Sequence, residues 1–305
     1  MTKYIHLIVL CAIMFTQAAC NRGAKNNNDG STDSLAHKEI EPFEGGYDSL
    51  LIKGAADPDS ALAEFEKRYS EEQRQVILAL NRIDRYHIKQ ADMLVVPDSV
   101  WTDLSVYSPF PPRLKELQEI HKIIFFSYPY QAFAVYENGL QVRWGPTSMG
   151  TQKDSTPVGL FFANWKAEEH ISTVDDEWLL KWNFNIENEK GVGWHLYAMP
   201  GYPASHSCLR LLENDARWLY DWADMWVLEG EHDVKAQGTP VIVFGSYDFS
   251  QKGPWLNLPD DPDANTISEA DLKRELESHL QKIQEEQERR RHVIQGEKRD
   301  STVAK

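Results

Sequence analysis

Short apolar runs separated by turn residues fill the chain from about residue 121 to 247. We expect strands in Ile123–Phe126, Ala132–Tyr136, Leu140–Trp144, Phe161–Ala163, Trp178–Phe184 and Pro240–Gly245. Asn138-Gly139 between two of these runs is a strong hairpin signal. One helix is expected, from Glu213 to about Leu228. Its tryptophans are spaced four apart on one face, which favours core packing over sugar stacking. The pattern predicts a mainly β domain with one packed helix.

A smaller unit is expected over residues 44–105. Helix starts are predicted after Asp57 and at Ser70, and the second helix has an apolar face from Val76 to Ile83. A short apolar strand ending at Pro97 closes the unit. Residues 44–105 are therefore predicted to form a small α/β or helical unit.

The last segment, residues 265–305, carries charges of both signs. Ser268 opens it like a capping box, and a narrow apolar stripe follows: Leu272, Leu276, Leu280 and Ile283. Three interpretations remain open: a solvated helix docked on the body, a weak coiled-coil helix for a protein partner, or a frayed charged tail. No candidate reacting group lies beyond Phe244, so we expect the tail to be dispensable for chemistry.

The first 43 residues are not expected to belong to a folded domain. Lys3, the apolar stretch Ile5–Phe15 and the small pair before Cys20 have the layout of an export signal over residues 1–20. Residues 21–43 are mostly polar and are predicted to be a flexible tether.

Composition narrows the class of protein. The chain has 305 residues, a formal net charge of −15, ten tryptophans and three cysteines. Such an acidic chain lacks the basic footprint of a nucleic-acid binder, so no nucleic-acid partner is expected. Three cysteines without a C-x-x-C pair exclude a disulfide scaffold and a zinc-finger motif. No apolar run reaches the length of an ordinary membrane span.

Cys208 is the candidate nucleophile. Cys11 leaves with the signal, Cys20 stands at the cleavage position, and so Cys208 is the remaining thiol of an exported chain. It lies in a Gly- and Pro-containing turn, two residues after His206 and 13 after His195. Because the predicted helix follows closely, we expect the helix dipole to lower the pKa of the thiol. A thiolate with a histidine partner is the arrangement of nucleophilic acyl transfer.

Three blocks of this region together resemble L,D-transpeptidases with a YkuD-type catalytic domain. The matching positions are His195, Ser205, His206, Cys208 and Arg210, preceded by Trp144–Gly150 and Ser155–Gly159. The resemblance covers about residues 121–247. It implies a β-sandwich catalytic domain with one packed helix after the nucleophile, in a chain that is α+β overall.

The resemblance has departures. Ser207 stands where the family has glycine before the cysteine, and Leu196 replaces the glycine after the first histidine. A backbone that needs a positive φ at Ser207 would be awkward for serine. The spacer from His195 to Cys208 is also a few residues short.

The resemblance implies a cysteine acyl transfer on peptidoglycan. Cys208 attacks the carbonyl at the third residue of a stem tetrapeptide, His195 acts as base and then acid, and the Leu196 carbonyl orients its other ring nitrogen. N–H groups around Ser207 and Cys208 hold the oxyanion, whereas Arg210, His206 and Ser205 bind substrate or shape the site. D-Ala leaves, and an amine of a second stem accepts the acyl group as a 3→3 cross-link.

Alternatives to this function remain open. Water as acceptor would make the chain an L,D-carboxypeptidase, and loss of activity would leave a wall-binding lipoprotein. His195, His206 and Cys208 could also be zinc ligands, but no carboxylate base stands at a telling spacing. Since the family uses no metal, no cofactor is expected.

Two weaker resemblances concern the N-terminal part. Gln17–Cys20 resembles a bacterial lipobox, which implies lipidation of Cys20 and a membrane anchor. Asn21 is not acidic, so we expect the outer membrane, facing the periplasm. Residues 78–97 resemble the second half of a LysM peptidoglycan-binding module, with a helix, an asparagine, a turn and a strand ending in proline. A purely structural helix-turn-strand is the alternative.

Overall fold

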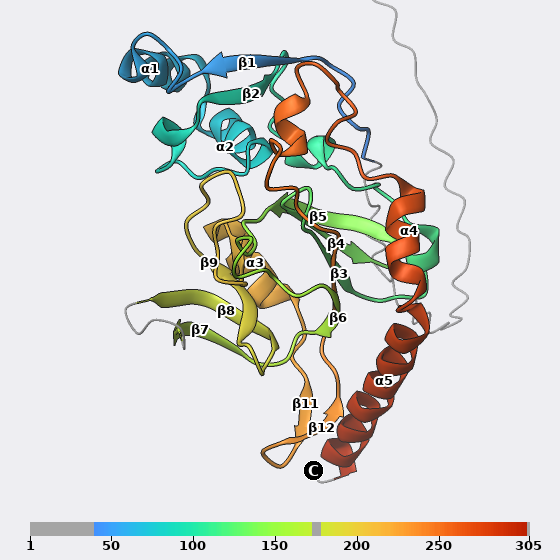
Figure 1. Ribbon diagram of the computed structural model, residues 1–305. Helices are drawn as coiled ribbons and strands as arrows, with labels where there is room; N and C mark the ends of the chain where they lie inside the picture. The colour runs from blue at the N-terminus through green and yellow to red at the C-terminus, as the bar shows by residue number, and fades with distance from the viewer. Residues whose placement is uncertain (1–39, 173–177, 304–305) are drawn as a thin grey trace, which may run out of the picture. The chain divides into compact units, whose positions relative to one another are not determined.

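The computed structural model describes residues 40–172 and 178–303, with side chains described to residue 296. The expected signal peptide, Cys20 and most of the expected tether lie outside the described residues. The described residues form one compact unit, shown as a ribbon in Figure 1. The unit contains helices and β-sheets, so the prediction of a mainly β chain of α+β class is confirmed.

A five-stranded sheet with the order β5-β4-β3-β13-β6 forms the centre. Its strands are β3 (Ile123–Ser127), β4 (Ala132–Glu137), β5 (Leu140–Pro146), β6 (Gly159–Phe162) and β13 (Pro240–Phe244). Only the β3–β13 pair is parallel. Ile124 and Phe126 face one buried cluster, and Ile123 and Phe125 face another. Because both faces are covered, the central strands are continuous apolar runs.

A four-stranded sheet with the order β10-β9-β8-β7 packs against the first face. Its strands are β7 (Lys166–Ile171), β8 (Leu179–Glu187), β9 (Val192–Leu196) and β10 (Leu209–Leu211). Trp194 is fully buried between the sheets, with ring centroids 6.4 Å from Phe126 and 4.7 Å from Phe184. β9 and β10 are parallel. This pair carries the candidate reacting groups.

Helix α3 (Glu213–Trp222) follows β10 and is shorter than predicted. Its end is set by tertiary contacts: the Thr239 N–H donates to the Asp224 carbonyl, and the Asp224 N–H donates to Thr239 Oγ1. Trp226 therefore lies beyond the helix, before the hairpin of β11 (Val227–Glu229) and β12 (Asp233–Ala236). Trp218 and Trp222 remain on α3, stacked 5.5 Å apart and partly buried against the core.

The first unit contains two strands and two helices: β1 (Tyr47–Leu51), α1 (Pro58–Arg68), α2 (Glu71–Leu80) and β2 (Met93–Pro97). β1 and β2 pair antiparallel. Ser70 and Gln73 form a capping box at the start of α2. Asn81, buried at its end, donates from Nδ2 to the Val95 carbonyl and accepts from the Val95 N–H at 2.8 Å. This amide fixes the helix to the strand.

The first unit shares a core with the central sheet. Val76, Leu80 and Val95 belong to the same buried cluster as Phe125. Phe43, at the end of the expected tether, packs against Tyr47, with the ring centroids 5.4 Å apart. Short 3-10 turns complete the connections: Ile88–Gln90, Leu104–Tyr107, Lys115–Leu117 and Pro254–Asn257. The unit is therefore packed against the sheet rather than suspended from a linker.

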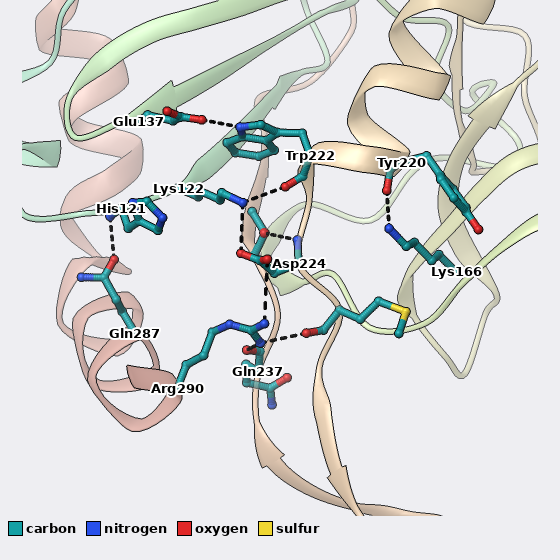
Figure 2. A network of polar contacts seen from close by, with 12 residues as sticks. His121, Lys122, Glu137, Lys166, Tyr220, Trp222, Asp224, Gln237, Gln287 and Arg290 are labelled. Carbon is teal, nitrogen blue, oxygen red and sulfur yellow. Dashed lines mark hydrogen bonds and ion pairs between the residues drawn. The ribbon is translucent and has the colours of Figure 1, made fainter. Parts of the chain in front are cut away.

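The tail forms α4 (Glu269–Glu277) and α5 (Leu280–Val303). Leu272, Leu276 and Ile283 are buried in the central cluster, so the tail is docked. Figure 2 shows how α5 is fastened beside the β11–β12 hairpin. Gln287 accepts from the His121 N–H at 2.7 Å, and Arg290 donates to the Met225 and Gln237 carbonyls at 2.8 and 2.9 Å.

Candidate active site

Cys208 lies at the end of a turn, immediately before β10, and is half-buried. Its thiol contacts the Gly191 carbonyl at 3.9 Å. The expected position at a helix start is wrong, because β10 separates Cys208 from α3. The expected lowering of the thiol pKa is wrong as well. Burial raises the pKa of Cys208, and this effect exceeds the opposite effects of the Gly193 backbone and Arg210.

His195 lies on β9 and is 4% exposed. Its Nδ1 is 3.0 Å from the Leu196 carbonyl oxygen. A carbonyl only accepts, so Nδ1 carries the proton and Nε2 presents a lone pair. Burial, with Arg210 adding to it, lowers the pKa of His195 to about 4. The imidazole is therefore neutral near pH 7 and able to accept a proton.

The strand register brings the candidate groups to one face. His195 on β9 lies directly opposite Arg210 on β10, so their side chains share a face of the sheet. Cys208 precedes Arg210 by two residues, and alternation along an extended chain puts it on that same face. Together with Ser205 and His206 they line a small pocket of about 30 Å³. The structure thus brings the predicted base and nucleophile together.

The turn before Cys208 is held by side-chain hydroxyls. Ser205 is 1% exposed, and its Oγ donates to the Cys208 carbonyl at 2.6 Å. Ser207 has a φ of +81°, the conformation in which glycine is favoured. Thr156 Oγ1 donates to the Ser207 carbonyl at 2.9 Å and accepts from the Gly150 N–H at 2.8 Å. The Thr156 hydroxyl, from the upstream block Ser155–Gly159, thus holds Ser207 in its strained conformation.

The other upstream block, Trp144–Gly150, contacts the same turn. Ser148 exchanges backbone hydrogen bonds with Arg210, both at 3.1 Å. Its Oγ donates to the Tyr202 carbonyl at 2.8 Å and accepts from the Ala204 N–H at 3.2 Å. At Gly150 a Cβ would lie 2.2 Å from the Asp154 carbonyl, so only glycine fits. These residues contact the segment before Cys208 but do not line the pocket.

Arg210 and His206 flank the pocket. The Arg210 guanidinium lies 4.6 Å from the Tyr197 ring centroid, and burial lowers its pKa. The side chain of His206 is half-exposed. Its Nε2 lies 3.9 Å from Asp154 Oδ2, and its ring centroid lies 5.1 Å from that of Trp178. Of the pocket residues, sequence reasoning missed Tyr197, Trp178, Leu180 and Ser172. The one available signal was position: Tyr197 lies two residues after His195, and Trp178 begins a predicted strand.

Within residues 40–172 and 178–303, no group of three or more His, Cys, Asp or Glu side chains is placed to hold a metal ion.

Comparison with known proteins gives one family and several distant structures. Residues 121–243 match the model of the L,D-transpeptidase catalytic domain family, YkuD. Among solved structures, an L,D-transpeptidase (Yku) from Stackebrandtia nassauensis is 22% identical with a TM-score of 0.34, over 42% of this chain and 57% of that one. An L,D-transpeptidase from Mycobacterium smegmatis is 24% identical with a TM-score of 0.33, over 41% and 59%.

The Mycobacterium tuberculosis L,D-transpeptidase 1 is 22% identical with a TM-score of 0.32, over 41% of this chain and 62% of that one. The chain thus spans less than two thirds of each of these three proteins. No curated protein matches the chain.

Proposed function

We propose that the protein is a peptidoglycan L,D-transpeptidase with Cys208 as nucleophile and His195 as base. The observation that carries the proposal is the β9–β10 register, which puts Cys208, His195 and Arg210 on one face. That pair lies inside the segment matched by the L,D-transpeptidase family model.

The resting pair is a thiol beside a neutral imidazole, because burial raises the pKa of Cys208 and lowers that of His195. The proton therefore leaves Cys208 as the sulfur attacks, and His195 Nε2 accepts it. The Leu196 carbonyl holds the tautomer that this step needs. This is general-base catalysis rather than attack by a preformed thiolate.

The acyl group is the carbonyl of the third residue of a stem tetrapeptide. As the C–S bond forms and the C–N bond to D-Ala breaks, the proton on His195 Nε2 passes to the departing amine. An amine of a second stem then loses its proton to His195, forms the new C–N bond and breaks the thioester. The proton returns to Cys208, so the enzyme is unchanged after one turnover.

The turn and the pocket wall supply the binding groups. N–H groups around Ser207 and Cys208 hold the oxyanion, an interaction worth roughly 3 kcal/mol per donor in comparable sites. The hydroxyl contacts of Ser205 and Thr156 support this role, because they fix the turn on both sides. Arg210 carries a positive charge at the pocket and is suited to a donor carboxylate.

Intact-mass spectrometry of the full chain with a disaccharide tetrapeptide tests the proposal. We expect an acyl adduct on Cys208 and release of D-Ala. Cys208→Ala should give neither, and His195→Ala should slow adduct formation at least ~10²-fold, the lower end for a general base. His232→Ala is the control, since its side chain is 91% exposed.

Product analysis separates the alternatives. A cross-linked dimer supports the amine acceptor, whereas a free tripeptide alone would point to an L,D-carboxypeptidase. A folded wild-type chain that forms no adduct would contradict catalysis and favour a wall-binding protein.

We also propose that Cys20 is lipidated and anchors the protein to the outer membrane, facing the periplasm. The lipobox-like Gln17–Cys20 and the polar stretch after it support this. Within the described residues no helix is long and apolar enough to span a membrane. Cys20→Ser should move the protein from the membrane to the soluble fraction, and a wild-type chain found only in the soluble fraction would refute the anchor.

The first unit is proposed to be LysM-like and to bind peptidoglycan. Its support is the order α2, Asn81, turn and β2, in which the asparagine links the helix to the strand. A protein partner for the charged C-terminal helix is a further proposal, supported by the exposed charged face of α5.

A further inference from the structure

The first unit contacts the loop that joins the base to the nucleophile. This loop, residues 197–207, runs from β9 with His195 to Cys208 before β10. Asp84 Oδ2 accepts from the Met199 N–H at 2.7 Å, and the Asp84 N–H donates to the Met199 carbonyl at 2.9 Å. Ile83 and Pro200 add an antiparallel bridge. One aspartate thus satisfies both backbone groups of Met199.

Asp84 is itself held firmly. Its Oδ1 accepts from the Tyr86 N–H at 2.8 Å and lies 2.7 Å from His87 Nδ1. Two residues earlier, Arg82 is fully buried and donates to the Leu80 and Tyr130 carbonyls. The carboxylate therefore has little freedom to follow the loop if the loop moves.

The loop is fastened at two points. Asp84 holds Met199 on the β9 side, and Ser148 holds Tyr202 and Ala204 on the β10 side. Between the second point and Cys208 lies the Ser205–Ser207 turn, which leads to the N–H groups around Ser207 and Cys208 that hold the oxyanion in the proposed reaction. A donor that misses its position by about 1 Å can cost ~10²-fold in rate.

We infer that Asp84 is a positioning residue for acylation: it fixes the 197–207 loop and, through it, the turn before Cys208. The inference rests on the proposed function. It makes the first unit part of the active-site support, whether or not that unit also binds glycan.

The chain offers a matched control within the same unit. Asp98 Oδ2 accepts from the Gly46 N–H at 3.1 Å, and the Asp98 N–H donates to the Gly46 carbonyl at 3.0 Å. Asp98 thus makes the same pair of contacts as Asp84, but to a segment beside β1. Asp84→Ala and Asp98→Ala each remove one carboxylate contact to a backbone N–H of another segment and keep the backbone bond beside it. Asp84→Ala also removes the local contacts to Tyr86 and His87.

Three rates are compared in the full chain. Acylation by the tetrapeptide needs the oxyanion turn, whereas alkylation of Cys208 by iodoacetamide does not. Amide hydrogen exchange reports the loop directly. For Asp84→Ala we expect acylation to fall about tenfold or more, alkylation to stay within about twofold, and exchange over 199–207 to rise. Asp98→Ala should leave all three near wild type.

The outcomes separate this inference from the proposed function. Unchanged exchange over 199–207 in Asp84→Ala would overturn the inference, even if no donor acylates the wild type. A loss of acylation together with a large rise in alkylation would indicate general unfolding, which exposes the thiol, and would also overturn the inference. Wild-type acylation with an unaffected Asp84→Ala would leave the function intact and refute the positioning role. If Asp84→Ala does not fold, the same comparisons are made with Asp84→Asn. This variant keeps the size of the side chain but replaces one acceptor oxygen by an NH2 donor.

Discussion

One residue of the turn before Cys208 has a strained backbone conformation that a side-chain hydrogen bond holds in place. Ser207 adopts a φ of +81°, and the Thr156 hydroxyl holds its carbonyl in that conformation. Sequence reasoning singled out Cys208 and His195, because both stand in recognisable strings, and both line one pocket in the structure. It did not find that the thiol is buried, because this burial depends on how β9 and β10 pair in the folded chain.

Replacing Ser207 by glycine should stabilise the fold. A left-handed conformation costs a non-glycine residue roughly 1–2 kcal/mol, and the greater freedom of unfolded glycine offsets about 0.5–1 kcal/mol of that. We expect Ser207→Gly to raise the free energy of unfolding in urea by up to about 1 kcal/mol. Activity should change little, because Thr156 already fixes the carbonyl.

Asn138→Gly is the matched control, because Asn138 also has a positive φ but asparagine tolerates it. A loss of stability in Ser207→Gly would show that the serine makes a contact worth more than the strain.

His195 should make the fold sensitive to acid. Its folded pKa of about 4 lies below the ~6.5 of an unfolded histidine, so over that interval the unfolded chain binds the proton. This contribution to stability is complete above pH ~6.5 and is lost as the pH falls toward 4, by up to about 3 kcal/mol. Urea unfolding at several pH values should show a smaller acid loss in His195→Gln than in wild type. Equal pH slopes in the two proteins would contradict the buried neutral imidazole.

Helices and strands were predictable where their pattern is local. The strands around Ile123 and Ala132 have apolar runs, the strand from Leu140 alternates apolar and polar residues, and all three form as expected. The end of α3 was not predictable, because hydrogen bonds between Asp224 and Thr239 stop it before Trp226. The tail helices were expected, but nothing local distinguished a docked helix from a frayed one.

The docked tail should contribute to stability. Leu276 is fully buried in the central cluster, so Leu276→Ala should cost about 2–5 kcal/mol in urea unfolding. Glu277→Ala, at the next and exposed position, should stay within ~0.5 kcal/mol. The tail is thus not dispensable for the fold. An unchanged midpoint for Leu276→Ala would show that the docked tail contributes little to stability; the expectation that the tail is dispensable for chemistry is separate from this test.

At the scale of the whole molecule, the first unit and the sandwich should unfold together. Leu80 from α2 and Phe125 from β3 lie in one buried cluster with Leu272 from α4. We expect a single calorimetric transition, coincident with loss of Cys208 protection from alkylation. Leu80→Ala should shift both signals by the same amount. Separate transitions, with Cys208 still protected after the first, would show that the two parts are independent.

Arg82 links folding of the first unit to a segment that follows β13 in the chain. Its guanidinium lies between Trp144 and Trp255, and its Nη2 donates to Asn265, 183 residues away in the sequence. In an emerging chain water solvates this charge, and the buried partners that replace the water are complete only once Asn265 has been made. Contacts of such long sequence separation slow folding. The first unit, although made before the sandwich, thus cannot reach its final state until the sandwich strands have been made.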